Sequence, residues 1–157
     1  MARPIPQYTV ADLEYLNDLD FGTFTTDDAA DLGIIAVELI REWDLSLAVD
    51  IVMGEYLVFR ARLGKTGPGN DPWLAGKAAT VRRFGEASYL VKTRHLEAGT
   101  PFEERTDVDH DSFKAHGGSV PIKVGGEIVA TITVSGEPDA VDHEVSAEAV
   151  RRYLASR

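Results

Sequence analysis

Helical periodicity is the first clear pattern along the chain. Apolar side chains over residues 26–43 recur at three- and four-residue steps and form one face, made of Leu32, Ile35, Ala36, Leu39, Ile40 and Trp43. Thr26 can cap this segment, and the acidic residues that follow suit the positive end of a helix dipole. Upstream, residues 10–16 predict a short helix or turn. The pattern therefore predicts one long amphipathic helix near the N-terminus.

The period then changes to two, which is typical of strands with one buried face. Residues 45–51 and 57–63 both alternate apolar and polar positions, and Gly54-Glu55 lies between them. A connection this short predicts an antiparallel hairpin.

A second hairpin is predicted over residues 119–134, where Gly125-Gly126 is a two-residue turn signal. Pro121 cannot donate to a strand ladder, so the run Ser119–Val124 is expected at a sheet edge. The run Ile128–Val134 carries β-branched residues at both sets of alternate positions, which indicates a central strand. Because both hairpins are local, the centre of the sheet must come from pairing one hairpin with the other.

Three further helices complete the pattern. Asp71-Pro72 is a strong helix start and Gly85 is typical of a left-handed stop, which predicts a helix over Asp71–Phe84. A helical stretch over Glu86–Ala98 follows, and the last helix is predicted over Asp139–Leu154. The order helix, hairpin, helix pair, hairpin, helix predicts an α+β fold with a central antiparallel sheet flanked by helices.

Composition sets the broad class. The chain has 157 residues, 44% of them hydrophobic and 27% charged, which is typical of one globular domain. It has no cysteine, which excludes disulfide scaffolds, thiol catalysis and zinc ribbons. No apolar run reaches the length of about 20 residues that spans a bilayer, and residues 1–6 lack the apolar core of a signal peptide. We therefore expect a cytoplasmic protein, with residues 1–23 as an N-terminal extension and 24–157 as a single domain.

Charge is distributed unevenly. The net charge is −10, which argues against nucleic acid and anionic membranes as partners. Residues 1–71 carry −8 and residues 97–157 carry −6, whereas residues 72–96 carry +4. A cationic segment in an acidic chain is a candidate place for a small anion, although pairing with acidic neighbours is the alternative.

The predicted helix from Asp71 holds the first candidate site. Trp73, Lys77, Arg82 and Arg83 lie on it, and a helix N-terminus with free N–H donors favours an anion. A flat ring beside cations suits a planar acid, a nucleotide or a porphyrin propionate. The alternative is that Trp73 belongs to the core and Lys77 extends to solvent.

The second candidate site is His116-Gly117-Gly118. Successive glycines allow neighbouring N–H groups to point into one concavity and bind an anion, and the imidazole can donate, transfer a proton or bind a metal. The alternative is a tight strand entry that needs a positive φ. Two other clusters are weaker: residues 107–111 read as an acidic surface turn, and Asp139 with His143 reads as a helix start rather than a metal pair. No metal site is predicted.

Several motifs together resemble one family. They are Asn70-Asp71-Pro72-Trp73, Lys77, Val81-Arg82-Arg83-Phe84-Gly85 with Ser88, Ala115-His116-Gly117-Gly118-Ser119-Val120-Pro121-Ile122, and Val134-Ser135-Gly136 followed by Asp142-His143. In this order, over residues 24–155, the set resembles the uncharacterised cytoplasmic branch of the GlcG/HbpS-like, or haem-degrading domain, superfamily. The resemblance implies a profilin-like α+β fold and a ring-like homo-oligomer, an octamer or decamer.

Three hypotheses for function follow. The first is a cytoplasmic homo-oligomer that binds a small anionic ligand, with or without catalysis, through Trp73, Lys77, Arg82, Arg83, His116, Gly117 and Gly118. The second is a protein that binds or degrades haem, a cofactor that the family resemblance implies, with His116 as iron ligand or proton donor. The third is a structural or adaptor oligomer in which these residues only stabilise the assembly.

Overall fold

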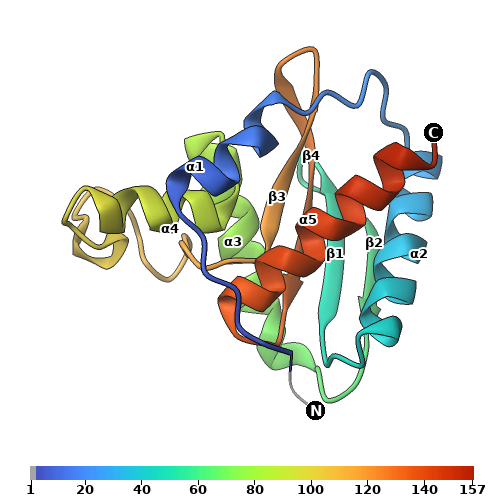
Figure 1. Ribbon diagram of the computed structural model, residues 1–157, viewed down its shortest axis with the longest axis horizontal. Coiled ribbons are helices and arrows are strands. Elements are labelled where there is room, and N and C mark those ends of the chain that lie inside the picture. The colour runs from blue at the N-terminus through green and yellow to red at the C-terminus, as the bar shows by residue number, and fades with distance from the viewer. Residues whose placement is uncertain (1–2) are drawn as a thin grey trace.

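The computed structural model of the chain describes residues 3–157 (Figure 1). Within them, the helices are α1 (Val10–Leu13), α2 (Thr26–Glu42), α3 (Asp71–Phe84), α4 (Ser88–Glu97) and α5 (Asp139–Ala155). The strands are β1 (Ala48–Met53), β2 (Tyr56–Arg62), β3 (Ser119–Val124) and β4 (Glu127–Ser135). Short 3-10 helices cover Glu14–Asp18, Pro68–Asn70 and Phe102–Glu104. This element order confirms the predicted α+β class.

The strands form one antiparallel sheet in the order β2-β1-β4-β3. β1 and β4 pair with Ile51 opposite Ile132, so the two local hairpins join at the centre of the sheet as predicted. Pro121 lies on β3, which is an edge strand, and β4 is central. Both of these positions were expected from the sequence.

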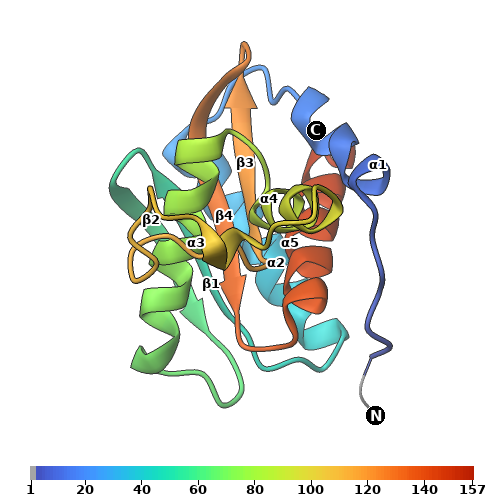
Figure 2. The same ribbon diagram turned by 90° about the vertical axis from the view of Figure 1, so that its left-hand side faces the viewer.

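Helices cover both faces of the sheet (Figures 1 and 2). α2 and α5 pack on one face, and α3 packs against β3 and β4 on the other. The main core lies under α2 and α5 and includes Leu32, Leu39, Ile40, Val49, Ile51, Val120, Ile132, Val134, Val145 and Val150. Each fully buried aliphatic side chain of this kind stabilises the fold by about 1.5–3 kcal/mol.

The prediction that the first strand buries only one face is wrong. Ala48 and Asp50 are buried as well as their apolar neighbours. Asp50 tolerates burial because Arg60 donates two hydrogen bonds of 2.6 Å to its carboxylate from the neighbouring strand. Asp50 is therefore buried and hydrogen-bonded on the polar face of β1, which a periodicity argument cannot reveal.

The helix bounds agree with the capping signals, with small differences. α3 runs from Asp71 to Phe84 and ends at Gly85, whose φ of 79° is left-handed. α2 is capped by Thr25 rather than Thr26, in a reciprocal capping box with Asp28. α4 begins at Ser88, later than predicted, because Ala87 is still extended.

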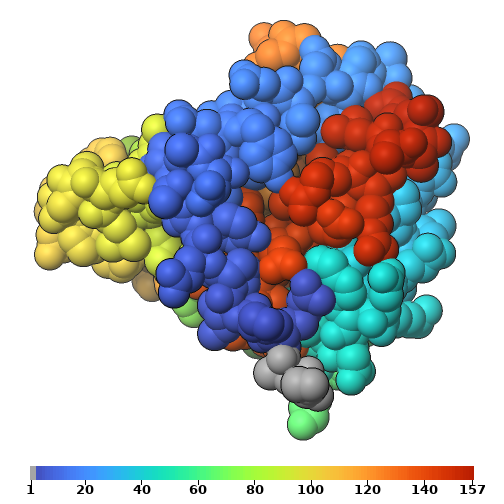
Figure 3. All heavy atoms as spheres, in the orientation of Figure 1, coloured from blue at the N-terminus to red at the C-terminus, as the bar shows by residue number. Residues whose placement is uncertain are grey.

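The N-terminal segment lies against the body of the molecule (Figure 3). Leu13, Leu16 and Phe21 are buried and belong to the main core. The segment 10–21 thus shares a core with the later elements, and the domain boundary at residue 24 stays a prediction. No helix within residues 3–157 is long and apolar enough to cross a membrane.

Candidate functional site

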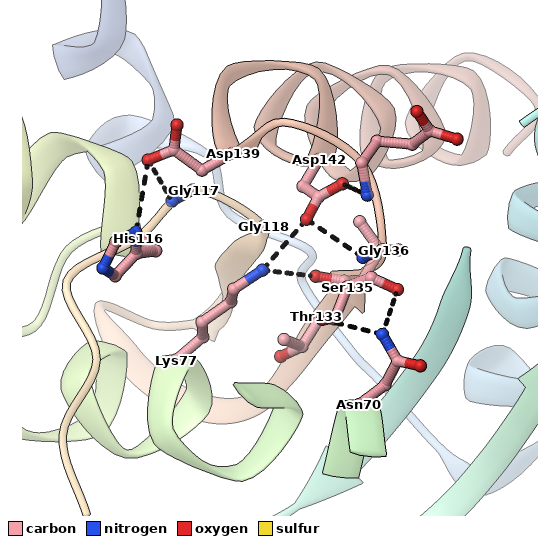
Figure 4. A network of polar contacts seen from close by, with 12 residues as sticks. Asn70, Lys77, His116, Gly117, Gly118, Thr133, Ser135, Gly136, Asp139 and Asp142 are labelled. Atoms are coloured by element: carbon pink, nitrogen blue, oxygen red, sulfur yellow. Dashed lines mark hydrogen bonds and ion pairs between the residues drawn. The ribbon is translucent and has the colours of Figure 1, made fainter. Parts of the chain in front are cut away.

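A cavity of about 490 Å³ opens between the start of α3, the loop before β3 and the turn from β4 into α5. Ligand cavities typically span about 300–1,000 Å³, so this one suits a small organic molecule. It is lined by Gly69, Asn70, Trp73, Lys77, Lys92, His116, Ser135, Gly136, Glu137, Asp139 and Asp142. Three residues predicted from the sequence, Trp73, Lys77 and His116, therefore line the same space. Figure 4 shows Lys77 and His116 among the polar contacts beside it.

Lys77 and Asp142 form a buried ion pair at this cavity. The ammonium Nζ of Lys77 donates to Asp142 Oδ2 and to the Val134 carbonyl, at 3.0 Å in each case. The two side chains are only 3% and 2% exposed. Lys77 is therefore buried, and the alternative interpretation of the sequence, in which it extends to solvent, is wrong. Removing one partner of such a pair typically costs about 3–5 kcal/mol, because the other charge is left buried.

The glycines before β3 make room for this pair. Gly118 has a φ of +136°, and a Cβ atom there would lie 2.9 Å from Lys77 Nζ and would collide with the Val134 carbonyl oxygen. A Cβ on Gly117 would collide with the carbonyl oxygen of Asp139. Both glycines thus serve the tight strand entry that was the alternative interpretation of this motif.

Burial sets the ionisation of Asp142. It raises the pKa of the carboxyl group to about 6, even though Lys77 and the backbone amides of Gly136 and Glu137 lower it. The Gly136 and Glu137 amides donate to the Asp142 carboxylate at 3.4 Å and 3.0 Å, respectively. Asp142 is therefore ionised at neutral pH but is a stronger base than an ordinary aspartate.

A second ion pair lies beside the first. Lys92 Nζ donates to Asp139 Oδ2 at 2.6 Å, and the amide of Gly117 donates to the same oxygen at 3.3 Å. His116 Nδ1 lies 3.7 Å from it. Burial raises the pKa of the Asp139 carboxyl, but the hydrogen bond and charge of Lys92, with the Gly117 amide and His116, together outweigh it, so the net direction of the pKa is down. Asp139 thus occupies the Gly117 amide that the sequence suggested for an external anion.

The rings of Trp73 and His116 form the outer wall of the cavity. Trp73 and His116 meet edge to face, with ring centroids 5.2 Å apart. Trp73 is 40% exposed, so it is not a core residue. Burial lowers the pKa of His116, and the cations of Lys92 and Lys77 lower it further, against the opposing effect of Asp139. The imidazole is therefore neutral at pH 7 and can accept or donate a hydrogen bond.

The cavity lining has two ammonium groups and three carboxylates, and the ammonium groups have unused donors. Each lysine is paired with an aspartate, and an ammonium has three N–H donors. Lys77 uses two of them, and within residues 3–157 Lys92 uses one. The carboxylate of Asp142, by contrast, accepts from three partners. The site can therefore satisfy acceptor atoms on a ligand better than donor atoms.

Arg82 and Arg83 lie away from this cavity. Arg82 lines a separate space of about 290 Å³ with Asp50 and Arg60. Arg83 donates to the Asp107 carbonyl at 3.2 Å and lies 5.2 Å from the Phe113 ring. The seven residues predicted from the sequence therefore lie in three different places: Arg82 in one, Arg83 in another, and the other five at or beside the cavity.

Lys92, Asp139 and Asp142 are among the cavity residues that sequence reasoning did not assign to it. Asp142 was present in a motif, and Lys92 belonged to the cationic segment 72–96, but neither had a local signal for a shared site. Their partners are 47 and 65 residues away in the sequence. A contact of that range leaves no trace in local periodicity.

The remaining clusters have structural roles. Asp109 accepts from the Asp111 amide and the Ser112 hydroxyl, as expected for a surface turn. His143 is fully buried, stacks on Tyr89 with centroids 5.4 Å apart, and is not paired with Asp139. Within residues 3–157, no three histidine, aspartate or glutamate side chains are grouped so as to hold a metal ion.

Comparisons with known proteins agree with this fold. A family model described as "Haem degrading protein HbpS-like" matches residues 24–151. A UPF0303 protein of Streptomyces coelicolor is 45% identical over 148 residues, which cover 93% of this chain and 94% of the relative. The crystal structure of Ybr137w protein superposes with a TM-score of 0.83 and 27% identity, covering 94% of this chain and 88% of that one. A PduOC structure in complex with haem, at 18% identity and a TM-score of 0.69 over 82% of this chain and 94% of that one, shares the fold. The chain therefore belongs to the HbpS-like haem-degrading family.

Proposed function

We propose that the protein binds a small organic monoanion, of the carboxylate class, in the cavity between α3 and α5. The observation that carries this proposal is the surplus of N–H donors on Lys77 and Lys92 around one space. Trp73 adds a half-exposed flat surface for an apolar part of the ligand. His116 adds a neutral ring at the mouth.

The charge balance favours a monoanion over a phosphate. The lining contains Lys77 and Lys92 against the carboxylates of Glu137, Asp139 and Asp142. A doubly charged ligand would be repelled by this set, whereas one carboxylate can share the lysine donors. The proposed set of contact residues is thus smaller than the set predicted from the sequence, because Arg82 and Arg83 lie outside the cavity.

Fluorescence of Trp73 provides the test. The chain has two tryptophans, so Trp43→Phe leaves Trp73 as the reporter. Titration with benzoate is expected to give a saturable change, and inorganic phosphate is expected to give none. Lys92→Met should weaken benzoate binding by about tenfold or more, since it removes a charge-assisted hydrogen bond.

Arg82→Met is the matched control, because it removes a cation from the same cationic segment but outside the cavity. It should leave the benzoate affinity unchanged. The proposal fails if benzoate produces no saturable change, or if the two variants weaken binding equally.

Haem is the second candidate ligand, because His116 presents an accessible imidazole. Its side chain is 38% exposed, and within residues 3–157 its Nε2 makes no hydrogen bond. A neutral imidazole is the form that binds iron, and Lys114 Nζ, 5.0 Å from the Trp73 ring centroid, suits a propionate. The residues therefore fit an axial ligand and an anchor. Bound haem would supply an iron centre for redox chemistry.

Titration with haemin separates this alternative from the first. A saturable Soret shift that is lost in His116→Ala would support it. An absent shift, or one that is unchanged in His116→Ala, would leave the carboxylate as the only ligand proposed.

We also propose that the protein is a cytoplasmic homo-oligomer, an octamer or decamer. Exposed apolar side chains on α2 and the β1–β2 hairpin support this, namely Ile34, Tyr56 and Leu57. Sedimentation should give the mass of eight or ten chains. If Arg83→Ala dissociates the assembly and no anion binds, the adaptor hypothesis replaces ligand binding.

A further inference from the structure

We propose that Lys77 forms a Schiff base with a small carbonyl compound, a 2-oxo acid, held in this cavity. The inference rests on the proposed function, because it names the substrate class of the same site. Proteins use desolvated lysines for this chemistry, and Lys77 is only 3% exposed.

Lys77 differs from the other lysines in its surroundings. The chain has five lysines, and Lys77 alone is buried; Lys65, Lys92, Lys114 and Lys123 are partly or fully exposed. Lys77 nevertheless lines the cavity, and its Nζ keeps one N–H after its bonds to Val134 and Asp142. A small ligand can therefore reach an amine that bulk solvent barely contacts.

The two lysines are placed for a 2-oxo acid in particular. Asp139 and Asp142 lie three residues apart on α5, so their side chains are neighbours on one helix face, about 5–6 Å apart at Cβ. Each aspartate holds one lysine, so both ammonium groups lie at the first turn of α5 (Figure 4 labels Lys77 and the two aspartates). A carboxylate at Lys92 would direct the adjoining carbonyl carbon toward Lys77.

The reaction needs a proton to pass from Lys77 to Asp142, whose Oδ2 lies 3.0 Å from the lysine nitrogen and is the base placed to take it. The transfer removes both buried charges together, and loss of water from the site assists it. The raised pKa of Asp142, about 6, makes its carboxylate a better acceptor than an exposed one. A ligand that fills the cavity expels water and shifts this balance further.

The reaction balances without another reagent. The ammonium of Lys77 gives one proton to Asp142, and the freed electron pair forms a bond to the carbonyl carbon. The π electrons move to the carbonyl oxygen, which takes the proton from Asp142 to give a carbinolamine. The nitrogen loses a second proton to that oxygen, the C–O bond breaks, and water leaves. Ammonium and ketone thus give a protonated imine and one water.

Reductive trapping tests the inference on the unmodified chain. The protein is incubated with pyruvate and sodium borohydride, and the lysine that carries the reduced adduct is located by peptide mass spectrometry. We expect the adduct at Lys77 to exceed that at each other lysine by at least about tenfold, by analogy with general-base assistance. Saturating benzoate, which has no ketone, should block it.

The outcomes separate the two proposals. If benzoate binds but pyruvate labels the five lysines equally, the Schiff base is overturned and anion binding stands. If Lys77 is labelled but benzoate neither binds nor protects, the carboxylate site is overturned instead.

Asp142→Asn gives an independent readout of the proton transfer. It keeps the size of the side chain and should slow trapping at Lys77 by about 100-fold. Asp139→Asn is the matched control one helical turn away and should slow it far less. Equal rates in wild type and Asp142→Asn would overturn the role of Asp142.

Discussion

Gly118 packs directly against the Lys77 side chain: a Cβ atom on Gly118 would lie 2.9 Å from the Lys77 ammonium nitrogen. The backbone at Gly118 also has a φ of +136°, and its carbonyl accepts hydrogen bonds from the Val134 amide and the Ser146 hydroxyl. The entry to β3 is therefore fixed against both β4 and α5, and the buried ion pair fills the space that the missing side chain leaves.

Gly118→Ala should lower the free energy of unfolding by about 2–4 kcal/mol, because a residue with a Cβ is strained at this φ and would displace Lys77. Urea denaturation measures the change. Gly67→Ala is the control, since a Cβ there meets nothing within 4 Å. A Gly118→Ala protein as stable as the Gly67→Ala protein would contradict this account of the strand entry.

The contributions of Asp142 and His143 to the pH dependence of stability should oppose each other between about pH 4 and 6. Burial raises the pKa of Asp142 to about 6, so the folded state binds a proton more tightly than the unfolded state, and this contribution is lost as pH rises. Burial lowers the pKa of His143 to about 4, so its contribution is lost as pH falls. Each has a slope of about 1.4 kcal/mol per pH unit in this window.

Single substitutions should reveal how each group makes the free energy of unfolding depend on pH. His143→Phe should lose up to about 2–3 kcal/mol of stability as pH rises from 4 to 6, and Asp142→Asn should gain a similar amount. Chemical denaturation across this range, taken as the difference from wild type, measures both. Parallel pH profiles for the two variants would show that the groups do not titrate as their burial requires.

The imidazole of His116 should titrate below its ordinary pKa of 6.5. Asp139→Asn should lower the pKa of His116 further, because the carboxylate favours the charged ring. NMR of the imidazole protons follows this titration, and the wild-type protein is the reference. A rise in the His116 pKa would contradict the arrangement around Asp139.

Affinity for benzoate should increase as pH falls from 8 toward 6. A bound carboxylate disfavours the charged form of Asp142 and so raises its pKa, which couples binding to proton uptake. We expect a gain of up to about tenfold over this interval. Trp73 fluorescence titrations at each pH measure it, and the dependence should disappear in Asp142→Asn. An affinity that falls on acidification would indicate that the ligand avoids Asp142.

Local signals were enough for the elements and their order. Pro72 and Gly85 fixed the bounds of α3, and Pro121 fixed β3 at the edge. That the two hairpins join in one sheet was predicted, but the pairing of β1 in particular with β4 was not. The cap at Thr25 rather than Thr26 was missed, because neighbouring threonines can both cap and only the backbone decides.

The site was predictable only in part, for a geometric reason. Trp73 and Lys77 are one helical turn apart and line one cavity. Arg82 follows Lys77 by five residues, which places it about 140° around the helix, so helical geometry alone could have separated it. The approach of Asp139 and Asp142 to two lysines depends on how α5 packs, which no local pattern encodes.

The first turn of α5 carries both Asp139 and Asp142, so the surroundings of Lys92 and Lys77 depend on the same helical turn. A mutation that rotates or frays that turn would release both cations together, whatever its distance from the cavity. Substitutions at the β4–α5 turn should therefore be treated as changes to the lysines' chemical environment, and a designer seeking to retune one lysine alone must leave that turn in place.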